Sequence, residues 1–140
     1  MEIVTKNAGE TKKFGRDFAT KLKGGEVICL EGDLGSGKTT FVQGLAEGLK
    51  AKNRVVSPTF ILMRQYNGEN LNIFHLDLYR LETNLQEELE NLGLYEIWGR
   101  TSNVVLIEWA EKIKELLPEN AKWIHFKNLS EEERIITTNE

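Results

Sequence analysis

One stretch of eight residues combines three glycines, a lysine and a threonine in a spacing suited to binding phosphate. Residues 32–39 read Gly-Asp-Leu-Gly-Ser-Gly-Lys-Thr and match the phosphate-binding loop (Walker A) pattern G-x-x-x-x-G-K-[ST] at every fixed position. Glycine lets the backbone wrap closely around an anion, because no Cβ blocks the approach. Successive amides then form a concave anion site at the start of a helix. The pattern predicts a nucleoside triphosphate site; the alternative is a glycine-rich turn without a ligand.

The polar residues of the loop have distinct predicted tasks. Lys38 supplies a mobile positive charge for the β- and γ-phosphates. Thr39 supplies a hydroxyl ligand for Mg²⁺, a cation that takes oxygen ligands. Asp33 is unusual here because a carboxylate repels phosphate, so we expect it to point outward, toward the metal shell or toward a partner. The loop residues predicted to contact the nucleotide are Gly32, Gly35, Ser36, Gly37, Lys38, Thr39 and Thr40.

Two acidic residues are candidates for holding the metal. Enzymes with this loop usually bind Mg²⁺ through the loop Ser or Thr and an acid that ends a second apolar strand. Glu108 follows the apolar run 104–107, and Asp77 follows the run 73–76. Ligands of open α/β sheets bind beyond the carboxyl ends of the strands, so one acid could bind the metal and the other orient the attacking water. We favour Glu108 for the metal because its run is continuously apolar; the alternative for each acid is a surface carboxylate.

Apolar patterning predicts the elements that position these residues. Helical spacing predicts helices over 10–23, 38–49, 85–92 and 109–117. Short apolar runs predict strands over 26–31, 60–66, 71–76, 103–107, 122–126 and 134–138. Thr11 is the expected N-cap of the first helix. This order predicts an α/β fold of the P-loop NTPase type, with a mixed, mainly parallel sheet flanked by helices and extended by antiparallel hairpins.

Length and composition narrow the class of protein. A chain of 140 residues is expected to form a single domain over 1–140. The formal charge of −4 argues against broad electrostatic binding of nucleic acid, which requires a basic patch. The single cysteine, Cys29, indicates a reducing compartment and is expected to be a buried core residue. Because no run is long and apolar enough to span a membrane and no signal core is evident, we expect a cytoplasmic protein without membrane contact.

Four segments occur together in an order that is typical of one bacterial family. They are the loop segment 32–41, Ser-Pro-Thr-Phe at 57–60, His-Leu-Asp-Leu-Tyr-Arg-Leu at 75–81 and Ile-Glu-Trp-Ala-Glu at 107–111. In this combination the chain closely resembles the TsaE (YjeE) family of ATPases, needed for the threonylcarbamoyladenosine modification of tRNA at adenosine 37. The sequence departs from the family's usual pattern at Ser36, where Ala is common, and at Ala110, where Pro is frequent.

The resemblance implies roles for individual residues. The loop would bind ATP or ADP, Thr39 and Glu108 would hold Mg²⁺, and Asp77 would lie beside the metal and take part in hydrolysis. Residues 57–59 would sense the nucleotide, with Thr59 near the γ-phosphate. A looser likeness places Thr11 and the segment around Glu132 to Arg134 at the adenine.

The resemblance also implies partners. Family members work with TsaB and TsaD, which carry the transferase chemistry, and hydrolysis resets that complex between rounds. Because this chain is acidic, any tRNA would be held mostly by the partners.

Three other function classes fit part of the sequence. A small-molecule kinase shares the loop, but the arginines here are scattered and no acceptor-binding segment is evident. A GTPase switch would carry a guanine-reading Asn-Lys-x-Asp segment, which the sequence lacks. A nucleotide-binding scaffold without turnover would not need Lys38, Thr39, Asp77 and Glu108 together.

His75, at the end of a predicted strand, is interpreted as a hydrogen-bonded structural histidine.

Overall fold

The computed structural model describes residues 1–33, 35–52, 55 and 62–139. The predicted nucleotide-sensing segment 57–59, with Thr59, therefore lies outside the described residues. The strands within the described part are β1 (Glu2–Thr5), β2 (Val27–Glu31), β3 (Met63–Asn67), β4 (Asn72–Asp77), β5 (Asn103–Glu108), β6 (Lys122–Asn128) and β7 (Arg134–Thr138). The helices described there are α1 (Ala8–Ala19), α2 (Lys38–Gly48), α3 (Leu85–Asn91), α4 (Leu94–Ile97) and the 3₁₀ helix η1 (Ala110–Leu116).

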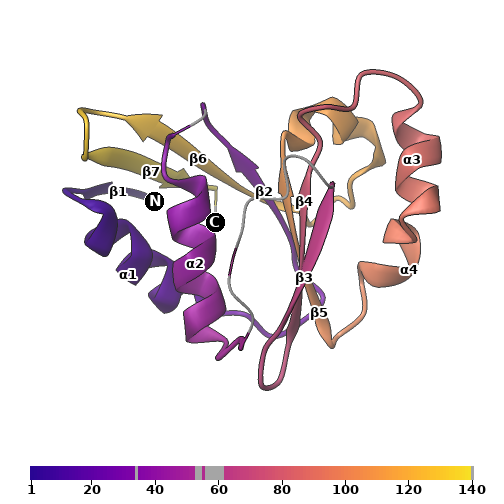
Figure 1. The fold of residues 1–140 in the computed structure, drawn as a ribbon, viewed down its shortest axis with the longest axis horizontal. Helices are drawn as coiled ribbons and strands as arrows, with labels where there is room; N and C mark the ends of the chain where they lie inside the picture. The colour runs from indigo at the N-terminus through magenta and orange to yellow at the C-terminus, as the bar shows by residue number, and fades with distance from the viewer. Residues whose placement is uncertain (34, 53–54, 56–61, 140) are drawn as a thin grey trace.

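The strands form one mixed sheet in the order β1-β7-β6-β2-β5-β4-β3. The four central strands, β6, β2, β5 and β4, are parallel to one another. Antiparallel strands extend both edges, through β7 and β1 on one side and through β3 on the other. The predicted fold class, a parallel sheet core with antiparallel hairpins and flanking helices, is confirmed (Figure 1).

Two hydrophobic clusters cover the two faces of the sheet. In Figure 1, α1 and α2 lie on one side of the sheet and α3 and α4 on the other. Because side chains alternate along a strand, Ile28 and Leu30 of β2 pack in the α1–α2 cluster with Phe41. Val27 and Cys29 face the opposite cluster, which includes residues of α3, α4 and η1. Cys29 is fully buried, as its core interpretation predicts, and burial raises the pKa of its thiol to about 12.

Helices α1 and α2 touch closely at several glycines, of which Gly44 and Gly15 make the shortest contacts. A Cβ at Gly44 would lie 1.9 Å from the carbonyl oxygen of Lys12, and one at Gly15 would lie 2.3 Å from that of Phe41. Both positions require glycine, since backbone atoms cannot give way at such distances. This close packing holds the start of α1 beside the start of α2, which is where the phosphate loop ends.

The structure corrects several predicted boundaries. Thr11 is not the N-cap of α1; Asn7 is, because its side chain accepts a hydrogen bond from the Glu10 amide at 2.9 Å. The helix also ends at Ala19 rather than at residue 23. The segment after β5 is a 3₁₀ helix that is interrupted by a kink at Ile113, whose backbone angles are non-helical, and Trp109 before it has a left-handed φ of 63°. Strand β1 and the short helix α4 were not predicted.

Candidate functional site

The phosphate loop connects the carboxyl end of β2 to the first turn of α2. Gly35 and Gly37 have φ angles of 77° and 100°, a left-handed conformation that favours glycine. Gly37 caps α2 without a side-chain hydrogen bond, so the first amides of the helix depend on other acceptors. The predicted order of strand, glycine loop and helix is therefore present, with α2 beginning at Lys38.

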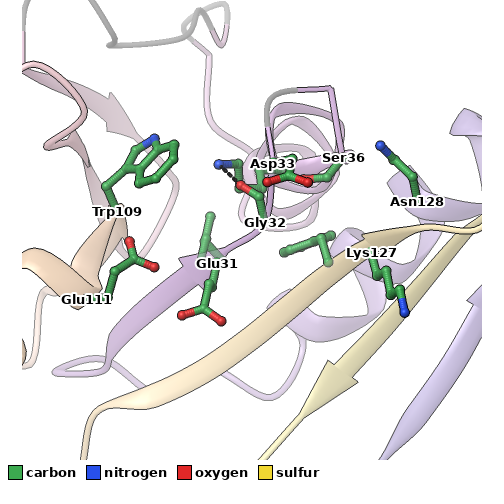
Figure 2. A pocket seen from close by; sticks show the side chains of 11 residues that line it. Glu31, Gly32, Asp33, Ser36, Trp109, Glu111, Lys127 and Asn128 are labelled. Atoms are coloured by element: carbon green, nitrogen blue, oxygen red, sulfur yellow. Dashed lines mark hydrogen bonds between the residues drawn. The ribbon is translucent and has the colours of Figure 1, made fainter.

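A cavity of about 390 Å³ opens beside this loop, within the size range of small-molecule sites. Figure 2 shows the loop residues Gly32, Asp33 and Ser36 between two sides of the cavity. Trp109 and Glu111, which follow β5, line one side, and Lys127 and Asn128 of β6 line the other, with Glu31 of β2 below the loop. Ser36 Oγ and Trp109 Nε1 are buried at this cavity without a hydrogen-bond partner among the described residues. Such polar atoms can be satisfied by a ligand. Asp33 is solvent-exposed.

Lys38 lies at the base of the loop and is 5% exposed. Its ammonium donates a hydrogen bond to the Gly32 carbonyl at 2.6 Å, drawn as a dashed line in Figure 2. The same Nζ lies 3.6 Å from Glu108 Oε1 and 5.2 Å from the centre of the Trp109 ring. Lys38 therefore joins the phosphate loop to the end of β5.

Glu108 is held as a carboxylate by two basic side chains. His75 Nε2 donates to Glu108 Oε2 at 2.6 Å, and the Tyr66 hydroxyl lies 3.4 Å from His75 Nδ1. Burial raises the pKa of Glu108, but the His75 hydrogen bond and the Lys38 charge outweigh burial and hold that pKa below its ordinary value of 4.5. The side chains of β3, β4, β5 and α2 thus form one buried polar chain that ends at the loop.

Asp77 lies directly beside Glu108 in the sheet. The parallel register of β4 and β5 pairs Asp77 with Glu108, and both residues are buried, at 2% and 4% exposure. Asp77 Oδ1 accepts a hydrogen bond from the Tyr79 amide at 2.9 Å. The alternative interpretation of these acids as surface carboxylates is therefore wrong.

The described residues contain no group of three or more His, Cys, Asp or Glu side chains arranged to hold a metal by themselves. Mg²⁺ usually takes one or two carboxylates and completes its shell with waters and substrate phosphates, so the predicted Mg²⁺ site stays a prediction. Thr39, in the first turn of α2, and the acids Glu108 and Asp77 provide oxygen donors of this kind.

Two other predicted site residues border the loop from outside. A Cβ placed on Gly37 would lie 3.5 Å from Thr11 Cγ2 and 3.6 Å from Arg134 Cγ. Arg134 Nη2 also donates to the Gly35 carbonyl at 3.1 Å. The structure therefore brings Thr11 and Arg134 to the loop from α1 and β7; their role at the adenine stays a prediction. Thr40 lies beside Thr39 in the first turn of α2.

The contact between His75 and Glu108 was not anticipated from the sequence. A signal for it existed in strand alternation, which places His75 and Asp77 on one face of β4. The pairing of β4 with β5 then places Glu108 next to that face. What the sequence did not reveal was that these two strands are neighbours.

The fold and the loop together define a P-loop NTPase-like protein, and comparison with known proteins gives the family. The family model described as "Threonylcarbamoyl adenosine biosynthesis protein TsaE" matches residues 5–136. The chain belongs to the TsaE family, as its sequence motifs predicted. No helix among the described residues has the length and apolar character needed to cross a membrane.

Several relatives extend this match over nearly the whole chain. The tRNA threonylcarbamoyladenosine biosynthesis protein TsaE of Bacillus subtilis is 44% identical over 133 residues, covering 95% of this chain and 81% of that protein. The protein of the same name from Rickettsia bellii is 38% identical over 141 residues, covering 99% and 95%. The crystal structure of Bacillus subtilis YdiB superposes with a TM-score of 0.77 at 38% identity, covering 99% of this chain and 83% of that one.

Proposed function

We propose that this protein binds ATP with Mg²⁺ at the loop of residues 32–39 and hydrolyses it as an accessory to threonylcarbamoyladenosine formation on tRNA. The observation that carries the proposal is the buried contact between Lys38 and Glu108 at the base of the loop, with Asp77 in register beside them. A glycine-rich turn without a ligand would not require a buried ammonium and two buried carboxylates at one edge of a sheet, because each is costly to bury.

Nucleotide binding would use the positive groups of the loop. The amides at the start of α2 would cradle the phosphates. The Lys38 ammonium would exchange the Gly32 carbonyl for phosphate oxygens, a short movement because both acceptors lie at the same loop. Ser36 Oγ and Trp109 Nε1, which lack partners among the described residues, would gain them from the ligand or its water.

The acids would act on the other side of the phosphates. Thr39 and Glu108 would hold Mg²⁺, with Asp77 beside it; the metal would neutralise charge that develops on the transferred phosphoryl group. His75 keeps Glu108 oriented and ionised through the 2.6 Å hydrogen bond. Asp77 would orient the attacking water and accept its proton.

The role in the cell would be that of a nucleotide switch. ATP binding would favour one conformation around the γ-phosphate, which Thr59 would sense, and hydrolysis would release it. Such a switch would act on TsaD-like and TsaB-like partners in the cytoplasm, and the acidic chain would meet tRNA only indirectly. Support comes from the family match and the relatives' names, which concern tRNA threonylcarbamoyladenosine biosynthesis.

The test combines calorimetry with phosphate release. ATP and ADP should bind, Mg²⁺ should tighten ATP binding, and GTP should bind more weakly. Phosphate should be released without any small-molecule acceptor, and addition of purified TsaB- and TsaD-like proteins should change the rate. Transfer to an added acceptor instead of water would favour the small-molecule kinase alternative, and absence of ATP binding would refute the proposal.

A further inference from the structure

A single lysine fastens the turn that follows Asp77. Lys112 lies in η1, and its Nζ donates hydrogen bonds to three backbone carbonyls of the turn: those of Leu78 at 3.1 Å, Tyr79 at 2.8 Å and Leu81 at 2.9 Å. An ammonium group has three donors and no acceptor, so these carbonyls use all of its hydrogen-bonding capacity.

The Lys112 ammonium also lies close to two aromatic rings, those of Tyr79 and Trp109. Lys112 Nζ lies 5.9 Å from the centre of the Tyr79 ring and 6.0 Å from that of Trp109, and the two ring centres are 5.1 Å apart. These distances fall within the range of cation–π attraction. Because Trp109 directly follows Glu108, the ammonium joins the chain leaving β5 to the chain leaving β4.

The turn that Lys112 fastens also holds the two acids. The Tyr79 amide donates to Asp77 Oδ1 at 2.9 Å, and the Leu78 amide donates to the Glu108 carbonyl at 3.1 Å. The amides of the turn therefore fix the carboxylate of Asp77 and the backbone of Glu108, and Lys112 fixes carbonyls of the same turn. A movement of this turn would change the distance between the two acids.

We infer that Lys112 is a positioning residue, which sets the Asp77 carboxylate relative to Glu108 through the turn of residues 78–81. The inference rests on the proposed function, because it assigns a use to the spacing of the two acids. It goes beyond that function in making an ammonium outside the phosphate loop part of the same site. Lys112 touches neither acid; its effect passes through the Tyr79 amide.

The variant Lys112→Met tests this role because it keeps the aliphatic stem and removes the donors. Substitution of groups that orient metal ligands typically costs 10- to 100-fold, so phosphate release at saturating ATP and Mg²⁺ should fall by about 10- to 100-fold. Affinity for a non-hydrolysable ATP analogue without Mg²⁺ should stay within about twofold, since the loop is untouched. Hydrogen exchange at the Tyr79 amide, measured by NMR in the nucleotide-free protein, should accelerate.

The control and the second variant separate positioning from a general structural effect. Lys114→Met removes the same charge from an exposed position of the same element and should leave all three measurements unchanged. Lys112→Arg keeps the charge, but its planar donors cannot reach three carbonyls in the same way, so it should show a smaller loss in rate and the same faster exchange. This variant carries the test if Lys112→Met does not fold.

A double-mutant cycle with Asp77→Asn decides whether Lys112 acts through Asp77. Adding Lys112→Met to Asp77→Asn should cost no further rate if the two residues act in one chain. Independent losses, or an unchanged Tyr79 amide in Lys112→Met, would overturn the inference. If the parent protein neither binds nor hydrolyses ATP, the proposed function fails, while the amide exchange still reports whether Lys112 holds the turn at Asp77.

Discussion

The phosphate loop and the two acids, Asp77 and Glu108, all lie at the carboxyl ends of the parallel strands, yet they are assembled differently. The loop is continuous in the chain, running from β2 through its glycines into α2. The acids come from two strands, and Asp77 meets Glu108 only because β4 pairs in parallel with β5. The positive half of the site is therefore local, and the negative half is a product of sheet topology.

The two halves also differ in what stabilises them. The loop is built on backbone conformation, with glycines at positive φ. The acids depend on side chains from elsewhere, namely His75 for Glu108 and the Lys112-held turn for Asp77. Lys38 is the link, because its Nζ contacts both the Gly32 carbonyl and Glu108. Substitutions can therefore damage one half and leave the other working.

The largest effect is expected at Glu108, in the negative half. Glu108→Gln keeps the shape of the side chain and removes its charge, so ATP hydrolysis should fall by about 100- to 1,000-fold, the usual cost of losing one electrostatic group at a reacting centre. ATP binding without Mg²⁺ should persist because the loop is intact. If phosphate release stops while calorimetry still detects ATP binding, the division of the site into two halves is supported. If Glu108→Gln hydrolyses ATP as fast as the parent protein, Glu108 does not hold the metal.

Lys38→Ala should affect binding itself. Loss of a charged hydrogen-bond donor to phosphate costs about 1.5–3 kcal/mol, so ATP affinity measured by calorimetry should weaken by about 10- to 100-fold. The same change leaves Glu108 without its ammonium neighbour, and Mg²⁺ dependence should alter as well. Lys13→Ala, at an exposed position of α1, is the charge-matched control. Equal ATP affinity in Lys38→Ala and the control would contradict the assignment of the loop.

His75→Phe should produce a smaller loss confined to the negative half. The ring volume remains, but Glu108 loses its 2.6 Å donor, so the Mg²⁺ concentration needed for half-maximal hydrolysis should rise about tenfold. Tyr66→Phe removes the more distant 3.4 Å contact with His75 and should have less effect on the Mg²⁺ requirement. A similar loss of Mg²⁺-free ATP binding in His75→Phe would instead indicate general unfolding of the site.

The smallest effect is expected at the rim of the cavity, where Glu111 lies beside Glu31. Burial and the neighbouring Glu31 carboxyl raise the pKa of Glu111 above 4.5. The folded protein therefore binds this proton more tightly than the unfolded chain, and this contribution to stability is lost as pH rises from 4.5 through the raised pKa. Glu111→Gln should make the free energy of unfolding less dependent on pH. The difference should be less than about 1 kcal/mol because the group is largely exposed.

Urea unfolding of the parent protein and Glu111→Gln between pH 4 and pH 8 measures this difference. Glu31→Gln removes the neighbouring carboxyl and should also reduce the change of the free energy of unfolding with pH. A free energy of unfolding that changes with pH equally in all three proteins would show that the two carboxyls do not interact.

Sequence patterns predicted an element best where its apolar periodicity and its flanking turn residues both indicate the same element. Helix α2, the hairpin of β3 and β4 and the buried strand β5 were found at nearly their observed positions because each has its own periodicity and turn. Strand β1 was missed because four residues carry little pattern, and it becomes a strand by pairing with β7. Thr11 was wrongly predicted as an N-cap because Asn7, four residues earlier, offers the same chemistry.

The sequence by itself determined the family and predicted the phosphate loop and the two acids as a site, because each depends on residue types at short spacings. Only the tertiary structure decided which side chains support those acids. His75, Lys38 and Lys112 reach Glu108 and the turn after Asp77 from separate elements, and their contacts exist only once the parallel strands are placed side by side. Local sequence does not encode that neighbour relation, because it follows from packing of the whole sheet between two hydrophobic clusters.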